Sequence, residues 1–351
     1  MYIAFINYYN AKSINLSASD GSRENGNLRF LELLKELDKE KINYEIYNKK
    51  NHNNYNLIIF FEVPNLLTLL FVKIKNISKK TPLILIIEET SVARSRNPLI
   101  IPFLFNEVLL NSENKNFRFK NYKTSIFSLG SLPSREEIIS NKDQILNSNR
   151  LKKLVYIGTN KTALNKNSSY QFRTKIIKKI STYKNIFTLF GQGWDQRQIP
   201  MDFPLVYIFY KIKPLKLLLK KLLNLNHFRV SSQGMVDSKI QTQNKFDFTL
   251  AIEPFMGYPL TILEKIFDPM LSGSIPIYFG PNQIPIPENC YLRIVKDTPL
   301  EKIIDLVKKT TLKEKKVMRQ NIYNFLISKK ADRYRYSTYA KFFIEKIKSY
   351  E

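Results

Sequence analysis

"FTLAIEPFMGYPLTILEKIFDPMLSGSIPIYFG" occupies residues 248–280. The stretch begins with an apolar run that is typical of a buried strand, and it ends with a second such run. Between the two runs, apolar residues recur at steps of three and four over 262–271, which predicts a short amphipathic helix. Gly273 suits the C-cap of this helix, whereas Pro269 predicts a kink or an early end. The stretch therefore predicts two parallel strands joined by a helix, the βαβ unit of α/β proteins.

The same alternation of strand and helix extends outward over much of the chain. Short apolar runs predict strands at 2–7, 43–48, 56–62, 82–88, 153–160, 185–194, 245–253 and 274–280, and amphipathic patterns predict helices at 28–41, 66–76, 171–183 and 261–271.

A polar stretch at 134–150 separates the two series of elements. We therefore expect an α/β protein with two Rossmann-like domains, an N-terminal domain over 1–150 and a C-terminal domain over 151–330, followed by a closing helix over 331–351. Ligands of such sheets bind beyond the carboxyl ends of the strands, so the expected site is the cleft between the domains.

The composition restricts the partners and the cofactors. The 351 residues carry a net charge of +26, which favours an anionic partner such as nucleic acid, a phosphorylated ligand or an acidic membrane. A compositional bias toward lysine in the whole proteome explains the charge equally well. A single cysteine, Cys290, and two histidines, His52 and His227, argue against a disulfide and against a zinc site. The sequence shows neither a leader with a basic start nor a run of about 18 apolar residues, so we expect a cytoplasmic protein without a spanning helix.

Two adjacent charges, Glu264 and Lys265, lie near the start of the predicted helix. The free N–H groups and the dipole at a helix N-terminus favour a phosphate, to which Lys265 adds a cation. Glu264 could accept hydrogen bonds from a ribose diol. Taken alone, such a pair is more often part of a solvated helix surface.

Three further segments, together with the opening stretch, resemble the donor-binding region of the bacterial α1,3-fucosyltransferases (glycosyltransferase family ten). "IGTNKTALNKNSSYQFRTKII" (157–177) is similar to the family's SN…R segment, and "LFGQGW" (189–194) is similar to its YGxGW strand end. "GMVDSKIQTQNKFDFTLAIE" (234–253) is similar to the family's segment that contains a Gly, a Lys and YKF and leads into the strand that ends in FEN. The opening stretch is similar to the TEK and GxxPVYxG motifs, with Pro254 in place of the Asn of FEN and Leu263 in place of the Thr of TEK.

The resemblance implies a GT-B type fold, in which the second domain binds a nucleotide sugar and the first domain binds the acceptor. Glu253 matches the Glu of FEN, Glu264 and Lys265 match the last two residues of TEK, and Arg173 matches the Arg after SN. Asn160, Gly191 and Lys239 are three further candidates for donor binding. Asn160 and Gly191 could instead serve ordinary turns, and Lys239 could instead lie on a solvated surface. The donor-binding residues are accordingly expected to be Arg173, Lys265, Glu264, Glu253, Asn160, Lys239 and Gly191.

Two carboxylates, Glu88 and Glu89, follow the predicted strand in "PLILIIEETSVARSRN" (82–97). An inverting transfer needs a base to take the proton of the acceptor hydroxyl. The segment is similar to the family's strand followed by ESP, whose Glu is the proposed base, and Glu89 gives the better match, with Glu88 as the second choice. Both residues could instead be solvated acids at a strand end.

Negative charge builds on the leaving pyrophosphate during transfer from a nucleotide diphosphate sugar, and a cation must meet it. No Asp-x-Asp triplet, the usual metal-binding pair of the other common transferase architecture, occurs in the chain. Arg173 and Lys265 are therefore expected to take this role, without a metal or another cofactor.

Residues 203–229 contain no acid, and leucines recur there at helical spacing among lysines. The pattern predicts a helix that lies on an anionic membrane surface, or equally an amphipathic helix packed on the domain with its lysines in water. The first reading would place the protein on the inner face of the membrane.

The expected function is thus transfer of fucose from GDP-fucose to a hydroxyl of a cell-surface glycan in an α1,3-type linkage, within lipopolysaccharide or polysaccharide biosynthesis. The departures at Pro254 and Leu263 leave another nucleotide sugar as the alternative. A nucleic-acid-binding protein ranks lower, since we find no nucleic-acid-binding module in the sequence, and no nucleic-acid partner is expected.

Overall fold

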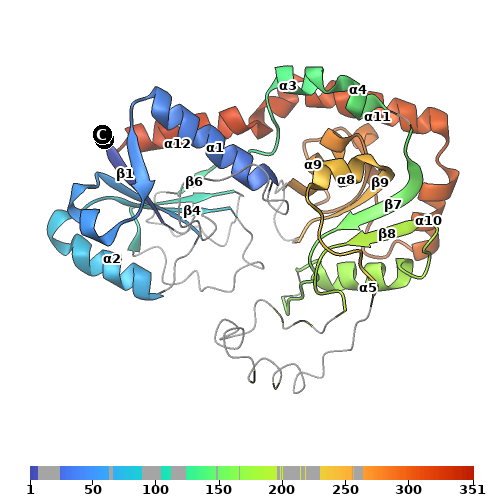
Figure 1. Ribbon diagram of the computed structural model, residues 1–351, viewed down its shortest axis with the longest axis horizontal. Coiled ribbons are helices and arrows are strands. Elements are labelled where there is room, and N and C mark those ends of the chain that lie inside the picture. The colour runs from blue at the N-terminus through green and yellow to red at the C-terminus, as the bar shows by residue number, and fades with distance from the viewer. Residues whose placement is uncertain are drawn as a thin grey trace. The chain divides into compact units, whose positions relative to one another are not determined.

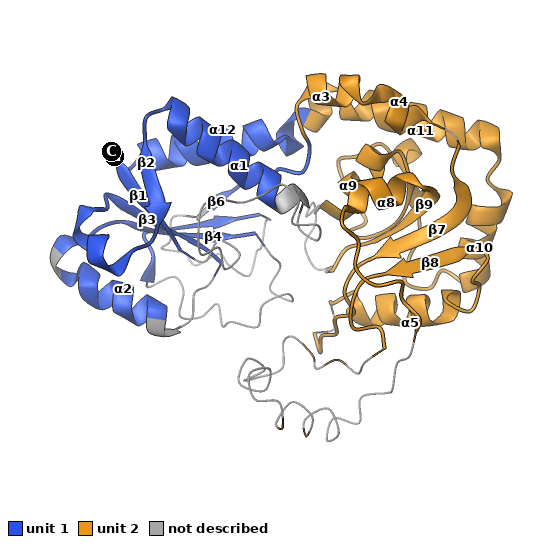
Figure 2. Ribbon diagram, viewed as in Figure 1, with its two compact units in different colours: residues 1–90, 96–132, 332–351 blue, residues 91–95, 133–331 orange. Residues whose placement is uncertain are grey.

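The computed structural model describes residues 1–6, 24–62, 66–88, 104–111, 124–147, 149–165, 167–195, 198, 200, 214, 218, 230–254, 256 and 264–351. The chain divides into two compact units (Figure 2). Unit 1 contains residues 1–90, 96–132 and 332–351, and unit 2 contains residues 91–95 and 133–331.

The division differs from the expected boundary near residue 150. It falls between Leu132 and Pro133, because the polar stretch forms two short helices, α3 (Arg135–Ser140) and α4 (Lys142–Leu146), that belong to unit 2. Helix α4 packs on α9 (Glu264–Ser272) and α11 (Leu312–Leu326) of that unit. The closing helix is not a separate part either: α12 (Tyr336–Lys348) packs along α1 (Glu24–Lys39) in unit 1.

Unit 1 is built on a six-stranded parallel sheet with the strand order β2-β1-β3-β4-β5-β6. Its central strands are short runs of β-branched, aromatic and leucine residues that are buried on both faces, as a covered parallel sheet requires. The strands are β1 (Tyr2–Ile6), β2 (Asn43–Ile46), β3 (Leu57–Phe61), β4 (Leu83–Ile87), β5 (Glu107–Leu110) and β6 (Thr124–Ile126), with a 3-10 helix η1 (Lys49–Asn54) after β2.

Helices cover both faces of this sheet (Figure 1). Leu69 and Val72 of α2 (Leu66–Lys79) pack on alternate residues of β1, β3 and β4. On the other face, the Phe30 ring of α1 meets the rings of Phe5 and Phe61, each with centroids 5.5 Å apart. Because side chains alternate between the two faces of a strand, one short apolar run supplies both cores.

Unit 2 is built on a five-stranded parallel sheet with the strand order β11-β10-β9-β7-β8. The strands are β7 (Leu151–Ile157), β8 (Phe187–Phe190), β9 (Phe246–Ile252), β10 (Ile275–Phe279) and β11 (Leu292–Arg293). The remaining elements of the unit are α5 (Tyr170–Ile180), α8 (Lys239–Asn244), η4 (Glu288–Cys290) and α10 (Leu300–Lys309), and η5 (Lys329–Tyr334) crosses into unit 1.

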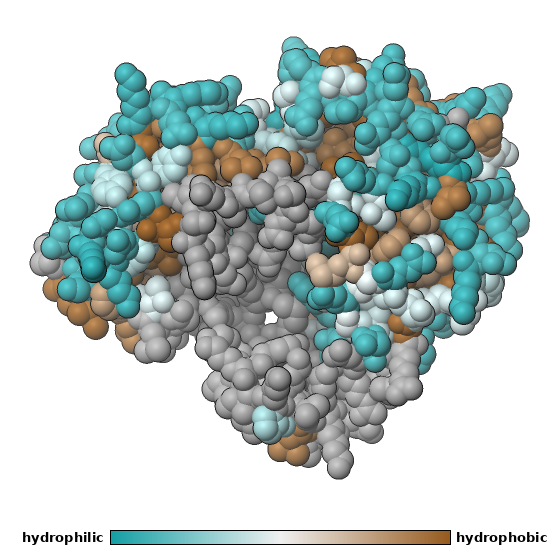
Figure 3. Space-filling view, in the orientation of Figure 1, coloured by the Kyte–Doolittle hydropathy of each residue, from teal (hydrophilic) through white to brown (hydrophobic). Residues whose placement is uncertain are grey.

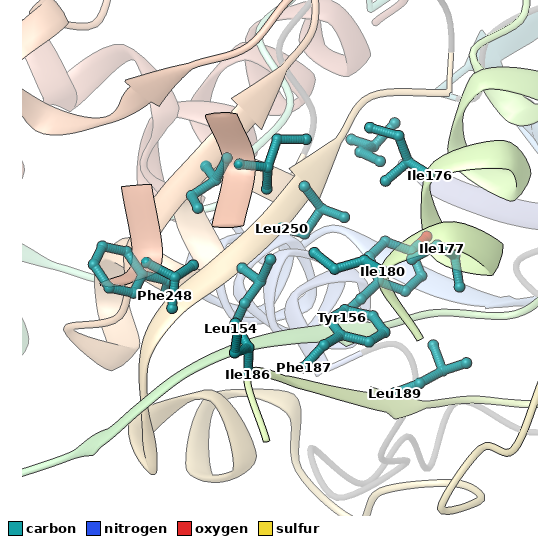
Figure 4. Packing of buried hydrophobic residues seen from close by; sticks show 14 of the residues in the cluster. Leu154, Tyr156, Ile176, Ile177, Ile180, Ile186, Phe187, Leu189, Phe248 and Leu250 are labelled. Carbon is teal, nitrogen blue, oxygen red and sulfur yellow. The ribbon is translucent and has the colours of Figure 1, made fainter. Parts of the chain in front are cut away.

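The core of unit 2 lies where α5 and α10 pack on the sheet. Figure 4 shows isoleucines of α5, among them Ile177 and Ile180, directed at Tyr156 of β7 and Leu250 of β9. Helix α9 continues through Pro269 to Ser272, so the expected early end is wrong, while Gly273 follows with a φ of +73° as a C-cap glycine should.

Candidate functional site

The carboxyl edge of the unit 2 sheet gathers residues that the sequence analysis selected from separate segments. In a parallel sheet all strands end on the same side. Gly158 follows β7, Gly191 follows β8, Glu253 follows β9 and Gly280 follows β10. Each of these positions therefore lies at this edge, where ligands of open α/β sheets bind.

Gly191 brings two of the strand ends into backbone contact. Its φ is +118°, and a Cβ atom at this position would lie 2.2 Å from the carbonyl oxygen of Gly158. Asn160 is buried and joins the same two loops, since its side-chain amide donates to the Gly193 carbonyl over 2.9 Å. Trp194 Nε1 donates to the Gly158 carbonyl over 2.7 Å. Gly191 and Asn160 thus hold the loops after β7 and β8 together at this edge of the sheet.

Arg173 lies in the first turns of α5 and is 3% exposed. Its guanidinium carbon lies 4.4 Å from the Tyr170 ring centroid and 5.9 Å from the Trp194 ring, and Nη2 donates to the Lys161 carbonyl over 2.8 Å. Arg173 Nε has no hydrogen-bond partner within the described part of the chain. A buried cationic donor without a partner is costly, so this atom is available to an anion.

Ser169 gives a second observation of the same kind. It is the N-cap residue of α5, yet its side chain makes no capping hydrogen bond, and its buried Oγ has no partner among the described residues. Its backbone N–H donates to the Pro254 carbonyl over 3.0 Å, which joins the start of α5 to the loop after Glu253. The N-terminus of α5 therefore presents this hydroxyl and the positive end of a helix dipole.

Lys265 lies in the first turn of α9 and is half-buried. Burial, the largest influence, lowers its pKa, but Glu264, Tyr156, Glu253 and Tyr170 together outweigh burial, and the net shift is upward. The ammonium group therefore stays charged near neutral pH. Tyr170 also stacks on the Arg173 guanidinium, so this residue interacts with both cations.

Glu253 is buried at the end of β9, where its backbone N–H donates to the Phe279 carbonyl over 2.8 Å. The electrostatic interactions of Lys265 with Glu264, Glu253 and Tyr170, and the stacking of Tyr170 on Arg173, link the four residues Arg173, Lys265, Glu264 and Glu253 at this edge. Lys239 instead forms an ion pair with Asp268 of α9, with Nζ 3.8 Å from Oδ2. This pair joins α8 to α9, which favours a packing role for Lys239.

Glu88 follows β4 in unit 1, and both of its carboxylate oxygens accept hydrogen bonds. Arg29 of α1 donates from Nη2 to Oε2 over 2.7 Å and from Nε to Oε1 over 3.2 Å, and the Tyr339 hydroxyl donates to Oε1 over 2.7 Å. These contacts make Glu88 an anchor between β4, α1 and α12. Glu89 lies outside the described residues, and its assignment as the base stays a prediction.

Sequence reasoning missed Glu62, which follows β3 as Glu88 follows β4. Glu62 is buried, has a φ of +63°, and accepts the backbone N–H of Glu88 over 2.8 Å. The signal was visible, because the predicted strand at 56–62 ends in this acid. The aromatic residues Tyr156 and Tyr170 were also missed, since nothing in their spacing distinguishes them from core residues, whereas Trp194 belongs to the LFGQGW segment that the sequence analysis matched to YGxGW.

The predicted membrane segment, residues 203–229, lies outside the described residues except for Pro214 and Leu218, both exposed. Within the described ranges, no helix has the length and apolar character to cross a membrane. In the same part of the chain, no group of three or more His, Cys, Asp or Glu side chains is placed to hold a metal ion.

Comparison with solved structures shows the fold. The Anabaena protein HepE, in complex with UDP-glucose, aligns over 99% of this chain and 100% of its own with a TM-score of 0.54 at 14% identity. An α-glucosyltransferase in complex with UDP and a DNA 13-mer aligns over 100% and 99% with a TM-score of 0.59 at 11% identity. The DNA-modifying enzyme β-glucosyltransferase aligns over 98% and 100% with a TM-score of 0.55 at 14% identity.

The chain has the GT-B fold. This confirms the predicted α/β architecture of two Rossmann-like units, each with a parallel sheet. No family model matches the sequence, and a search of curated proteins finds no match. At such low identities the likenesses establish the fold alone, and the function has to be argued from the site.

Proposed function

We propose that the protein is an inverting glycosyltransferase that holds a nucleotide diphosphate sugar at the carboxyl edge of unit 2 and transfers the sugar to an acceptor hydroxyl. We take GDP-fucose as the donor and a cell-surface glycan as the acceptor, in line with the resemblance to family ten. The reaction would belong to lipopolysaccharide or polysaccharide biosynthesis.

The observation that carries the proposal is the group of polar atoms at the start of α5. Arg173 Nε and Ser169 Oγ are buried without described partners, and both lie at the N-terminal end of the α5 dipole. A pyrophosphate supplies oxygens for both of these donors, and its negative charge suits the helix N-terminus. The charged Lys265, on α9, interacts electrostatically with Tyr170, whose ring stacks on the Arg173 guanidinium.

These residues would stabilise the leaving group. Negative charge grows on the pyrophosphate as the bond to the sugar breaks, and Arg173 with Lys265 would meet that charge in a partly water-excluded site. We propose that this pair serves without a metal ion. Glu253 or Glu264 would accept hydrogen bonds from hydroxyls of the ribose or of the sugar.

We further propose Glu89 as the base that takes the proton of the acceptor hydroxyl. Glu88 would then position the loop after β4 rather than take a proton, since Arg29 and Tyr339 already bind both of its oxygens. One base is sufficient for an inverting transfer.

A uridine nucleotide sugar is the second candidate donor. The side-chain amide of the FEN motif is absent at Pro254, which offers its backbone carbonyl to Ser169, and the hydroxyl of the TEK motif is absent at Leu263. HepE and the α-glucosyltransferase with the same fold carry UDP-glucose and UDP. We rank this donor second because the matches at Glu253, Glu264 and Lys265 follow family ten.

A donor screen tests the proposal. GDP-fucose, GDP-mannose, UDP-glucose and UDP-N-acetylglucosamine are each incubated with the protein, with and without mixed glycan acceptors, and nucleotide release is measured. We expect acceptor-dependent release of GDP from GDP-fucose that survives excess EDTA. Release of UDP alone would select the second candidate, and loss of activity restored by Mn²⁺ or Mg²⁺ would refute metal independence.

An acceptor arm completes the screen, with duplex DNA in place of the glycans. The α-glucosyltransferase of the same fold was solved with DNA, so a DNA acceptor has to be tested against the glycan. Release that depends on DNA would replace the glycan acceptor in the proposal, and no release with any donor and acceptor would refute the transferase.

A further inference from the structure

Helix α2 of unit 1 has an apolar stripe on its outer side. Leu69 and Val72 face the sheet and are buried. Leu70, Ile74 and Ile77 are 48%, 65% and 74% exposed. Their spacing of four and three residues places them on one side of the helix. A solvated helix normally presents polar residues there, so three large apolar side chains at this spacing indicate a surface that meets something apolar.

Lysines surround the stripe. Residues 46–87 contain six lysines and one acid, Glu62, which is buried. Lys75 and Lys80 are exposed and Lys73 is half-buried, and none of these three has an ion-pair partner among the described residues. The remaining lysines of this range are Lys49, Lys50 and Lys79.

The opposite face of unit 1 differs in its charges. Exposed lysines on α1 and α12 pair with acids there, as Lys39 does with Glu36 and Lys348 with Glu40. Figure 3 shows hydrophobic surface at the lower left, where α2 lies in Figure 1. The α2 side of the unit is thus both apolar and cationic.

We infer that α2 lies on the surface of a bilayer that contains anionic lipids. Leu70, Ile74 and Ile77 would enter the boundary between headgroups and acyl chains, and the lysines would meet lipid phosphates. Helix α2 has 14 residues, which suits a helix that lies on a membrane rather than one that crosses it. A nucleic acid would use the lysines but not the stripe, and a second copy of the chain would place these lysines against each other. The inference is independent of the proposed reaction and of residues 203–229.

Vesicle sedimentation of the full chain tests the inference. The wild type is compared with Ile74→Glu/Ile77→Glu and with a control, Leu312→Glu/Val317→Glu on α11. The control makes the same charge change at residues that are 53% and 54% exposed and that also lie among lysines. All three proteins are tested with phosphatidylcholine vesicles, with and without phosphatidylglycerol. Circular dichroism melts establish that they are folded, and GDP binding is measured separately.

We expect the wild type and the control to bind the anionic vesicles, and to bind them less strongly at high salt. The partition coefficient of the α2 variant should be lower than that of the wild type by about tenfold or more. Equal binding by the wild type and the α2 variant would overturn the inference, as would an equal loss in the control or no binding by the wild type. Binding of short duplex DNA by the wild type and the α2 variant alike, without vesicle binding, would identify a polyanion site instead. A dimer of the wild type that the α2 variant loses in gel filtration, again without vesicle binding, would identify a second copy as the occupant.

Discussion

Gly191 adopts a φ of +118° at the end of β8, and its α-carbon faces the Gly158 carbonyl. A side chain here meets two penalties, since the backbone conformation disfavours L-residues and a Cβ would lie 2.2 Å from a backbone oxygen. Gly234 provides a comparison, because its φ is +87° and a Cβ there would meet no atom within 4 Å. A substitution at Gly234 therefore tests the backbone strain alone, whereas a substitution at Gly191 tests the strain together with the steric clash.

We predict that Gly191→Ala lowers the free energy of unfolding by roughly 3 kcal/mol or more, because the clash adds to the strain. Gly234→Ala should lower it by about 1–2 kcal/mol, from the strain alone. Urea unfolding of the two variants measures both values. Similar losses would show that the contact with Gly158 does not constrain Gly191.

Substitutions of Glu88 and Glu89, the two acids after β4, should affect different properties of the protein, namely stability and turnover. Glu88→Gln leaves the buried Arg29 without its carboxylate and should cost about 3–5 kcal/mol of stability. Glu89→Gln should keep the stability and reduce turnover by about 10²- to 10⁴-fold, with GDP binding near normal. Turnover and urea unfolding are measured on both variants. A Glu89→Gln variant with normal turnover would remove Glu89 as the base.

At the scale of elements, α12 is held on unit 1 by a buried acid at the start of β5. Glu107 is 0% exposed and accepts hydrogen bonds from Lys346 Nζ over 2.8 Å, Ser125 Oγ over 2.7 Å and the Tyr350 hydroxyl over 3.1 Å. Burial, the largest influence, raises the pKa of Glu107, but these three partners outweigh it and the pKa lies below its ordinary 4.5. A lowered carboxyl pKa contributes stability above the ordinary value, and that contribution is lost as the pH falls through the folded value.

We therefore predict that Lys346→Met destabilises the protein by about 1–3 kcal/mol at neutral pH, where it leaves Glu107 buried and charged without its main partner. The difference from the wild type should shrink below pH 4.5, as Glu107 takes up a proton. Urea unfolding on both sides of that pH measures the effect. A constant difference would show that Lys346 acts through packing and not through its charge.

Much of the fold could be predicted because short apolar runs and amphipathic patterns alternate along the chain, and the predicted strands that precede Gly158, Gly191 and Glu253 all form. Strands β5 and β6 were missed, since Glu107 begins the first with a charge and the second is three residues long. The helix through Pro269 shows a limit of another kind, because tertiary packing of its buried face overrides the local preference. The partners of Arg173 come from its own helix and from two loops, after β7 and after β8, and no sequence pattern specifies such contacts.

At the scale of the whole molecule, three buried acids of the described residues form ion pairs in the interior. Glu88 pairs with Arg29, Asp247 pairs with Lys315 and Arg319, and Glu107 pairs with Lys346. Because buried acids neutralise cations inside the units, they do little to offset the lysines on the surface. The excess positive charge of +26 therefore lies mainly on the surface of the protein, which supports an anionic partner.

Calorimetric titration with GDP of the wild type, Lys265→Ala and a control, Lys175→Ala, tests the central claim most directly. Lys175 lies on α5 but is exposed. The account predicts that the wild type and the control bind GDP alike, and that Lys265→Ala binds it about tenfold more weakly or worse, because a charge-assisted bond to phosphate is lost. An unchanged Kd in a folded Lys265→Ala variant, or a wild type that binds neither GDP nor UDP, would contradict it.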